Sequence, residues 1–353
     1  MIIKKTEAAV LFESHAPLKL VEIDLPEELE AGQVLVELIT SGICGAQINE
    51  IDAVKGPDKF LPHLLGHEGL AKVLEVGPGV SKLVPGDEVV MHWRPSAGII
   101  AKTPNYRFEN RIINAGWVTT FNRHAVVSEN RLTKIQIGSS DKYVLPLLGC
   151  ALTTALGVLE NDAKFSGRDS LLIFGLGGVG VSLILFAKFL RARKIVVVDI
   201  DVRKKLFAEK LGVDKFIQFN SKDQTIRELE AFFGANLPSL AIDTSGKSTS
   251  IEICYEITSD LGRVILVGVP NISDKTTIYT LPLHFGKVLT GSKGGDSIPD
   301  KDIPFIIELL KTSELDVSNF PVTKISFDKI NEGIDLIRSG INGRVVIDFG
   351  SQI

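Results

Sequence analysis

The residues with the clearest chemistry are the glycines of LIFGLGGVG, residues 172–180. The apolar, β-branched run before them predicts a buried strand, and an apolar helical pattern follows. In a GxGxxG turn between a strand and a helix, Gly175 permits the tight turn and Gly177 lets the backbone approach a pyrophosphate, while Gly180 allows helix and strand to pack closely. The helix N-terminus then offers unpaired N–H groups to phosphate oxygens. This unit predicts a dinucleotide site.

A carboxylate follows the next predicted strand. Asp199 ends the apolar run Ile195–Val198, about 20 residues beyond the last glycine of the turn. At that distance a carboxylate can hold both hydroxyls of the adenosine ribose. Because it would repel a 2′-phosphate, Asp199 favours NAD over NADP. Arg203, four residues further on, leaves NADP as an alternative.

Two cysteines and one histidine stand beside turn-forming glycines. They are Cys44 in SGICGAQ, His67 in LLGHEG and Cys150 in LLGCALTT. Two thiolates and one imidazole suit a catalytic Zn²⁺ and leave one coordination position for water or substrate. Glu68 adds a carboxylate that could support these ligands or act as a further one. Their wide spacing, taken alone, fits equally well two core thiols and a turn-capping histidine.

Length, charge and cysteine number restrict the class of protein. The 353 residues are enough for two domains, and 39 basic against 43 acidic side chains give no basic face for nucleic acid. No apolar run is long enough to span a membrane, and the N-terminus predicts an opening strand rather than a signal peptide. Three widely spaced cysteines argue against a disulfide framework, and Cys254 is expected in the core, on a helix. We therefore expect a soluble, cytoplasmic protein.

The pattern of predicted elements changes near residue 150. Before it, alternating apolar residues and turn signals predict short strands, which favours a small barrel or sandwich. These strands are expected within 34–44, 71–93 and 124–135. After it, buried strands alternate with helices, which is typical of a parallel, doubly wound α/β sheet. Its later strands are expected within 216–220, 240–246 and 263–270, ahead of a helical segment and a closing strand.

In their order along the chain, these motifs resemble those of the zinc-containing medium-chain dehydrogenase/reductase family, which includes the alcohol and polyol dehydrogenases. The likeness covers nearly the whole length and rests on GICG, GHEG, GDEV, GC followed by TTALG, GLGGVG, LVGVP and FDKINEGIDLIRSG. It implies a GroES-like β-barrel catalytic domain over residues 1–151, completed by 294–353. It also implies a Rossmann NAD-binding domain over 152–293, and a homodimer or homotetramer by analogy.

The resemblance assigns roles to single residues. It makes Cys44, His67 and Cys150 the ligands of one catalytic zinc, with Glu68 beside them as a further catalytic and metal-site residue. It places the cofactor pyrophosphate on Gly175, Gly177, Gly178, Val179 and Gly180, and the adenosine ribose on Asp199. It directs backbone groups of Val267, Gly268 and Val269 to the nicotinamide carboxamide and Arg344 to a cofactor phosphate. Thr153 and Thr154 would begin the helix beneath the nicotinamide.

The chain departs from the family pattern in ways that bear on its chemistry. Residues 91–122, where many members carry four cysteines for a structural zinc, contain none, so we expect no structural zinc. Ala46 and Asn49 stand where a hydroxyl and a histidine usually pass the substrate proton to solvent. Gln47 replaces the usual acidic residue near the zinc. The proton therefore needs another route, for which Glu68, His63, His92 and ordered water are the candidates, with His92 preferred.

The resemblance implies an enzyme: a zinc-dependent, NAD(P)-linked alcohol dehydrogenase with NAD preferred. Zinc would act as a Lewis acid on the substrate oxygen while a hydride passes to the nicotinamide. The His, Trp, Arg, Asn and Tyr residues of 91–122 favour a polyol or sugar derivative as the alcohol. Two alternatives remain: a zinc-free quinone- or enoyl-reductase-like enzyme, and a nucleotide-binding protein without turnover.

Overall fold

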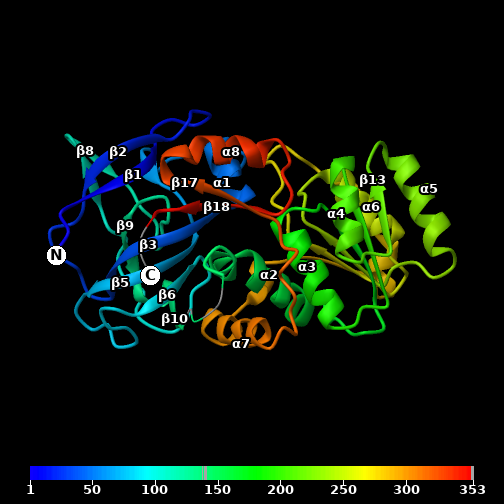
Figure 1. The fold of residues 1–353 in the computed structure, drawn as a ribbon. Coiled ribbons are helices and arrows are strands. Elements are labelled where there is room, and N and C mark those ends of the chain that lie inside the picture. The colour runs from blue at the N-terminus through cyan, green and yellow to red at the C-terminus, as the bar shows by residue number, and fades with distance from the viewer. Residues whose placement is uncertain (137, 139–140, 351–353) are drawn as a thin grey trace. The chain divides into compact units, whose positions relative to one another are not determined.

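The computed structural model describes residues 1–136, 138 and 141–350 (Figure 1). The chain divides into two compact units. Unit 1 comprises Met1–Thr153, Ile298–Lys311 and Val322–Ile353, and unit 2 comprises Thr154–Ser297 and Thr312–Pro321. This division lies within a few residues of the predicted domain boundaries. It differs in residues 312–321, which cluster with unit 2 although the prediction placed them in the catalytic domain.

Unit 1 contains two β-sheets. The five-stranded sheet has the order β4-β1-β2-β7-β8, and its first pairs are antiparallel. Its strands are β1 (Lys5–Leu11), β2 (Lys19–Asp24), β4 (His63–Leu64), β7 (Tyr106–Phe108) and β8 (Arg111–Ile113). Along β1, Ala8 and Val10 belong to one apolar cluster while Ala9 and Leu11 belong to another. Both faces of this strand are therefore buried, as expected where strands enclose a core.

The seven-stranded sheet of unit 1 has the order β10-β6-β5-β3-β18-β17, with β9 also paired to β3. Its strands are β3 (Gln33–Ile43), β5 (Glu68–Val76), β6 (Glu88–His92), β9 (His124–Ser128), β10 (Leu132–Ile135), β17 (Val322–Ser326) and β18 (Arg344–Asp348). The closing strand β18 pairs antiparallel with β3 and so returns the chain end to the barrel. Unit 1 is thus β-rich and includes a strand from the C-terminal part of the chain.

In the described part of unit 1, these sheets are accompanied by the helices α1 (Gly45–Ile51), α7 (Pro299–Lys311) and α8 (Ile330–Arg338). Helix α8 is amphipathic, with Ile330, Gly333 and Ile334 buried at helical spacing. A Cβ on Gly333 would lie 2.4 Å from Ile325 Cδ1 and 2.8 Å from Ile43 Cδ1. This glycine therefore lets α8 pack directly on the strands, close to the point where β3 leads into α1.

Unit 2 is built on one parallel six-stranded sheet of order β13-β12-β11-β14-β15-β16. Its strands are β11 (Ser170–Phe174), β12 (Lys194–Asp199), β13 (Lys215–Gln218), β14 (Leu240–Asp243), β15 (Arg263–Leu266) and β16 (Val288–Gly291). The strand order reverses between β11 and β14, the switch point at which doubly wound sheets bind ligands. The Rossmann topology is confirmed; β13, β14 and β15 begin within one residue of the predicted segments and end two to four residues before them.

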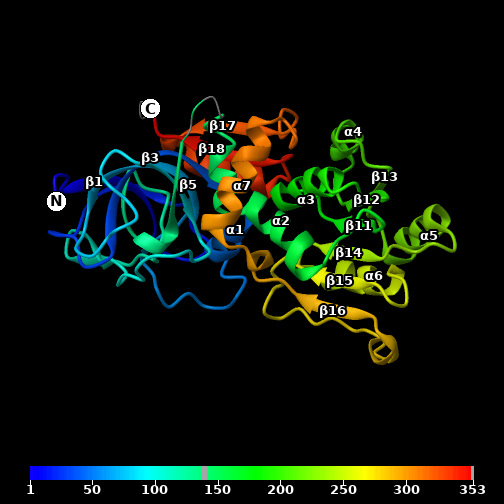
Figure 2. The same cartoon turned by 90° about the horizontal axis from the view of Figure 1, so that it is seen from below.

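Helices cover both faces of this sheet. They are α3 (Gly178–Phe189), α4 (Lys205–Lys210), α5 (Lys222–Phe233) and α6 (Ser248–Ile257), while α2 (Ala151–Gly157) contains the boundary between the units. Figure 2 shows α3 and α4 on one side of the sheet and α5 and α6 on the other. Cys254 lies fully buried on α6, as predicted. None of the helices among the described residues is long and apolar enough to cross a membrane.

Candidate functional site

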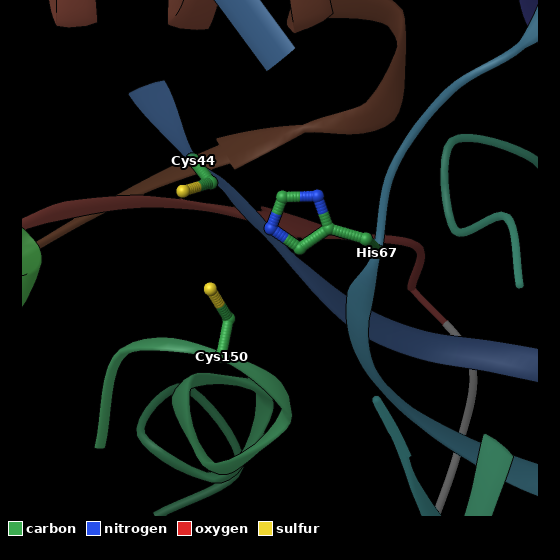
Figure 3. Close-up of side chains that lie close together, drawn as sticks. All are labelled: Cys44, His67 and Cys150. Atoms are coloured by element: carbon green, nitrogen blue, oxygen red, sulfur yellow. The ribbon is translucent and has the colours of Figure 1, made fainter. Parts of the chain in front are cut away.

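Cys44, His67 and Cys150 come together in unit 1 (Figure 3). Their ligand atoms all lie within 4.8 Å of one another, and Figure 3 shows both sulfurs and one ring nitrogen of His67 directed toward a common point. Among the described residues, Cys44, His67 and Cys150 form a group whose side chains are close enough to hold one metal ion. The spacing left open whether the three residues meet, and the fold brings them together.

Each of the three side chains is fixed by a rigid element. Cys44 follows the central strand β3 and caps the N-terminus of α1. His67 precedes β5, after Gly66 with φ +91°, where a Cβ would lie 2.2 Å from Thr120 Oγ1. Cys150 ends the short turn Leu145–Gly149 and leads into α2. The glycine before His67 therefore serves close packing that a side chain would block.

The buried thiols and imidazole fit a zinc ion in type and number. The Nε2 atom of His67 is buried and makes no hydrogen bond, while its other ring nitrogen, Nδ1, lies 2.8 Å from Gln47 Nε2. A buried ring nitrogen without a partner costs free energy unless a ligand occupies it. The two cysteine sulfurs and His67 Nε2 together are the set of three protein ligands that is typical of a catalytic zinc.

The ionisation of the cluster is strongly coupled. A hydrogen bond from the Cys150 thiol holds the pKa of Cys44 well below its usual value, against the effect of burial, and Arg344 adds to the lowering. The same contact with Cys44, together with burial, raises the pKa of Cys150. Burial opposes a charged His67, but the Cys44 sulfur outweighs it and raises the pKa of the imidazole. The site thus already favours one thiolate, the form that binds metals.

Glu68 lies at the base of this cluster and is paired with Arg344. Its carboxylate is fully buried, and Oε1 lies 3.2 Å from Arg344 Nε. Burial raises the pKa of Glu68 while Arg344 lowers it. Burial opposes the charged form of Arg344, but Glu68 and the two cysteines outweigh it and raise the pKa of Arg344. The carboxylate packs against Gly42, where a Cβ would lie 2.2 Å from Glu68 Oε1. Within this pair, the Arg344 guanidinium is the positive charge that stabilises a thiolate at Cys44.

This placement bears on two predictions from the sequence. Glu68 is not among the three residues whose atoms converge, so its role as a further metal ligand stays a prediction. Arg344 was predicted to reach a cofactor phosphate, which stays a prediction; its guanidinium is buried beside Glu68 within unit 1. Sequence reasoning missed this ion pair, although a buried arginine next to a strand end demands a carboxylate partner.

The candidate proton carriers are engaged elsewhere. His92 is buried, with Nδ1 2.7 Å from the Arg94 carbonyl and Nε2 3.0 Å from Thr133 Oγ1, whose hydroxyl donates to Asp300 at 2.7 Å. Burial lowers the pKa of His92 to about 4. The preference for His92 as proton carrier was therefore wrong, because both nitrogens already bond within unit 1.

His63 is similarly occupied. Its Nε2 lies 2.6 Å from Asp58 Oδ2, and its Nδ1 lies 3.0 Å from the Leu64 carbonyl. Ala46 and Asn49 lie half-buried on α1 beside the cluster. Since Ala46 has no exchangeable proton, α1 carries no hydroxyl relay at that position.

The glycine turn of unit 2 has the predicted geometry. Gly175 has φ +94°, and Gly177 is the N-cap of α3, without a side chain that caps its N–H groups. A Cβ on Gly177 would meet no atom within 4 Å, whereas one on Gly180 would lie 2.1 Å from the Gly175 carbonyl oxygen. Gly180 is thus required by packing within the turn, while space beside Gly177 is left for a ligand. Gly178 and Val179 form the first turn of α3, whose N–H groups point toward that space.

Asp199 lies at the end of β12, beside this turn. Its Oδ2 accepts a hydrogen bond from the Leu176 N–H at 2.6 Å and lies 3.1 Å from Lys204 Nζ, while Oδ1 accepts from the Asp201 N–H at 3.0 Å. Both Asp199 and Lys204 are buried. Sequence reasoning missed Lys204, although a lysine five residues after the carboxylate that ends the strand is well placed to pair with it. Arg203 points to Asp201, with three contacts of 2.7–3.0 Å.

The remaining cofactor residues lie in the loop after β15. A Cβ on Gly268 would lie 2.1 Å from Gly246 N, and one on Gly246 would lie 2.4 Å from the Val269 carbonyl oxygen. The loops that follow β14 and β15 therefore run side by side at the carboxyl end of the sheet, where the N–H groups of Val267 and Gly268 both donate to the Asp243 carbonyl. In unit 1, the hydroxyl of Thr153 bonds to the carbonyls of Leu148 and Cys150, so it fixes the turn that carries Cys150.

Sequence comparisons agree with this architecture. The family model described as "Alcohol dehydrogenase GroES-like domain" matches residues 30–137, and the model described as "Zinc-binding dehydrogenase" matches 178–312. The S-(hydroxymethyl)glutathione dehydrogenase of Escherichia coli O1:K1 / APEC is 26% identical over 383 residues, covering 98% of this chain and 100% of that protein. The enzyme of the same name from Shigella sonnei (strain Ss046) has the same identity and coverage.

Solved structures share the fold. The benzyl alcohol dehydrogenase of Acinetobacter calcoaceticus has a TM-score of 0.86 at 23% identity, covering 98% of this chain and 99% of that one. An "Alcohol dehydrogenase zinc-binding domain protein" from Burkholderia ambifaria has a TM-score of 0.87 at 23% identity, with coverage of 98% and 99%.

A GroES-like unit, a Rossmann unit and a Cys-His-Cys cluster together define a zinc-dependent oxidoreductase of the alcohol dehydrogenase type. The two family models account for more than half of the chain, and the relatives align along its whole length. The chain belongs to the zinc-containing medium-chain dehydrogenase/reductase family.

Proposed function

We propose that this protein is an NAD-linked alcohol dehydrogenase with one catalytic zinc per chain, held by Cys44, His67 and Cys150. The observation that carries the proposal is the convergence of these ligand atoms around a buried His67 Nε2 that lacks a hydrogen-bond partner. Bound there, zinc supplies a Lewis acid for the substrate oxygen. The zinc-free alternative gives no reason for two buried thiols and an unsatisfied imidazole to meet.

The residues of the chain hold and orient the reactants. The α3 N-terminus and the space beside Gly177 would bind the pyrophosphate, and Asp199 would accept from the ribose hydroxyls. Backbone groups of Val267–Val269 would bind the carboxamide. The nicotinamide supplies the hydride acceptor. Arg344 holds a positive charge behind the cluster and remains the proposed partner of a cofactor phosphate.

The carboxylate environment supports NAD over NADP. A 2′-phosphate would meet Asp199, and Arg203, the group that left NADP open, is paired with Asp201. We expect kcat/KM with NAD to exceed that with NADP by at least about tenfold, since a buried charge pair of like sign costs more than 1.4 kcal/mol. Equal values with the two cofactors would overturn this part of the proposal.

The substrate is proposed only as an alcohol or the corresponding carbonyl compound. Two polar residues that favoured a polyol are buried and bonded internally: His92, and Tyr106, whose hydroxyl lies 2.8 Å from the Val126 N–H. The polyol preference therefore loses part of its basis. With Ala46 in place of a hydroxyl and with His63, His92 and Glu68 already paired, ordered water is the proposed route for the proton.

A substrate screen tests the proposed activity. Protein loaded with zinc is incubated with NAD and a panel of aliphatic, aromatic and polyhydroxylated alcohols, and NADH is followed by its absorbance. Turnover that a chelator abolishes and added zinc restores is the expected result. Binding of both zinc and NAD without turnover across the panel would favour the nucleotide-binding alternative, and turnover unaffected by the chelator would favour the zinc-free one.

We also propose that the protein forms a homodimer through the edge of the unit 2 sheet. Strand β16 ends the sheet, and apolar side chains near it are strongly exposed: Ile272 (73%), Tyr279 (70%), Leu281 (47%), Phe285 (69%) and Val288 (42%). Two aromatic side chains alone bury at least about 300 Å², and with the aliphatic ones this approaches the roughly 800 Å² per partner of a stable interface. An open strand can pair with the same strand of a second copy.

Light scattering after gel filtration tests this interface. Wild type is expected at twice the chain mass, and Phe285→Asp is expected to shift toward the monomer. A monomeric wild type, or a variant that stays fully dimeric, would contradict the proposed interface.

A further inference from the structure

Gln47 makes three polar contacts next to the metal cluster. It lies on α1, one turn after Cys44, and is buried. Its amide nitrogen lies 2.8 Å from His67 Nδ1 and 3.1 Å from Glu50 Oε2, and its amide oxygen accepts from the Gly66 N–H. Gly66 immediately precedes His67. The amide is therefore held between the loop that carries His67 and the helix that follows Cys44.

These contacts fix the hydrogen on the His67 ring. An amide nitrogen only donates, so Nδ1 accepts in this arrangement, and a neutral ring carries its hydrogen on Nε2. Nε2 is the atom directed at the two sulfurs. A histidine that binds a metal through Nε2 must instead carry the hydrogen on Nδ1 and donate it to an acceptor.

The amide is unable to serve both of its neighbours in the metal-bound state. The Gly66 N–H and the Nδ1–H would both be donors, and they face opposite edges of the Gln47 amide. Whichever way the amide turns, one of these donors meets the amide nitrogen rather than the oxygen. A carboxylate at this position would accept from both, because each of its oxygens is an acceptor.

We propose that Gln47 is a positioning residue that links zinc binding to the orientation of its own amide. Zinc binding turns the Gln47 oxygen to His67 Nδ1 and leaves the Gly66 N–H without its acceptor. The residue thereby holds zinc more weakly than a carboxylate would in the same place. This inference rests on the proposed zinc site of Cys44, His67 and Cys150.

The chain offers a charge-neutral test. In the double variant Gln47→Glu/Glu50→Gln, the carboxylate and the amide exchange places, so the net charge and the contact between positions 47 and 50 are kept while Nδ1 gains an acceptor. Glu50→Gln alone is the matched control, because it removes the Glu50 charge and leaves the amide beside His67. Zinc affinity of each purified protein is measured by competition with a chromophoric chelator, with thermal melting to verify folding.

The double variant is expected to bind zinc about 10–100-fold more tightly than wild type and than Glu50→Gln. Gln47→Met, similar in size but without an acceptor, is expected to bind at least about tenfold more weakly than wild type and tests the positioning role if the double variant fails to fold. A zinc affinity within about threefold of that of wild type, in the double variant or in Gln47→Met, would overturn the inference. If wild type itself binds no zinc, the proposed function fails instead, so the two failures are distinguishable.

Discussion

The two candidate sites are built in opposite ways. The phosphate turn of unit 2 is a contiguous stretch in which backbone groups act and the glycines keep side chains away. The metal cluster of unit 1 consists of side chains from three distant segments, and a buried ion pair and an amide support it. The first site depends on conformation and the second on charge and donor types. Substitutions should therefore affect the two sites separately.

The largest effect is expected from Cys44→Ser. Loss of one of three protein ligands removes the zinc and with it several kcal/mol of transition-state stabilisation, so turnover should fall by at least about 1000-fold. NAD affinity, measured by fluorescence titration, should stay within about twofold, since the turn lies in the other unit. Cys254→Ala, at a buried thiol of unit 2, is the control that should retain zinc. Loss of NAD binding in Cys44→Ser would show that the sites are not separate.

A pair of glycine variants tests the backbone site. A methyl group at Gly177 has open space in the fold, so Gly177→Ala should change the free energy of unfolding by less than about 1 kcal/mol. It should weaken NAD binding by about 100-fold, because the methyl group occupies the approach of the pyrophosphate.

Gly180→Ala, unlike Gly177→Ala, should act mainly on stability. Its Cβ would lie 2.1 Å from the Gly175 carbonyl, so stability should fall by about 1–3 kcal/mol through forced backbone shifts. Calorimetry and NAD titration separate the two effects. Equal destabilisation by both variants would contradict the division between ligand space and packing.

A smaller effect is expected from Asp199→Asn. Asp199 is the side chain that is proposed to bind the cofactor beside the glycine turn of unit 2. Loss of the carboxylate should lower the ratio of kcat/KM for NAD over NADP by about tenfold, because the repulsion of a 2′-phosphate disappears. Zinc content should be unchanged. A ratio equal to that of wild type would show that Asp199 does not select the cofactor.

The smallest effect concerns His92, whose two ring nitrogens bond to Arg94 and Thr133 within unit 1. Its folded pKa of about 4 lies below the ordinary value of 6.5, so the neutral form is the folded one. The stability that it contributes is complete about one pH unit above 6.5 and is lost as the pH falls toward 4, with about 1.4 kcal/mol lost at pH 5.5. His92→Gln should flatten the decline of stability between pH 6.5 and 4 in urea titrations, whereas His15→Asn, at an exposed position, should leave it unchanged. An unaltered decline in His92→Gln would exclude this role.

The contrast between the sites also explains what the sequence revealed. The glycine turn, its strands and Asp199 are contiguous, so local pattern was enough to place them within one or two residues. The metal cluster needed the resemblance, because residues as far apart as Cys44 and Cys150 meet only through sheet pairing around β3. The preference for His92 as proton carrier was wrong and the ion pair of Arg344 was missed for the same reason: their partners Thr133 and Glu68 lie in other segments, and burial decides what they contact. Lys204 was missed because its pairing with Asp199 follows from the loop geometry after β12.

Metal analysis of protein purified without added zinc tests the central claim most directly. Wild type and Cys44→Ser are prepared in parallel and measured by atomic emission, with protein quantified by amino-acid analysis. We expect close to one zinc per chain in wild type and almost none in the variant. Wild type without zinc, and unable to take it up on titration, would contradict the assignment of Cys44, His67 and Cys150 as a catalytic zinc site.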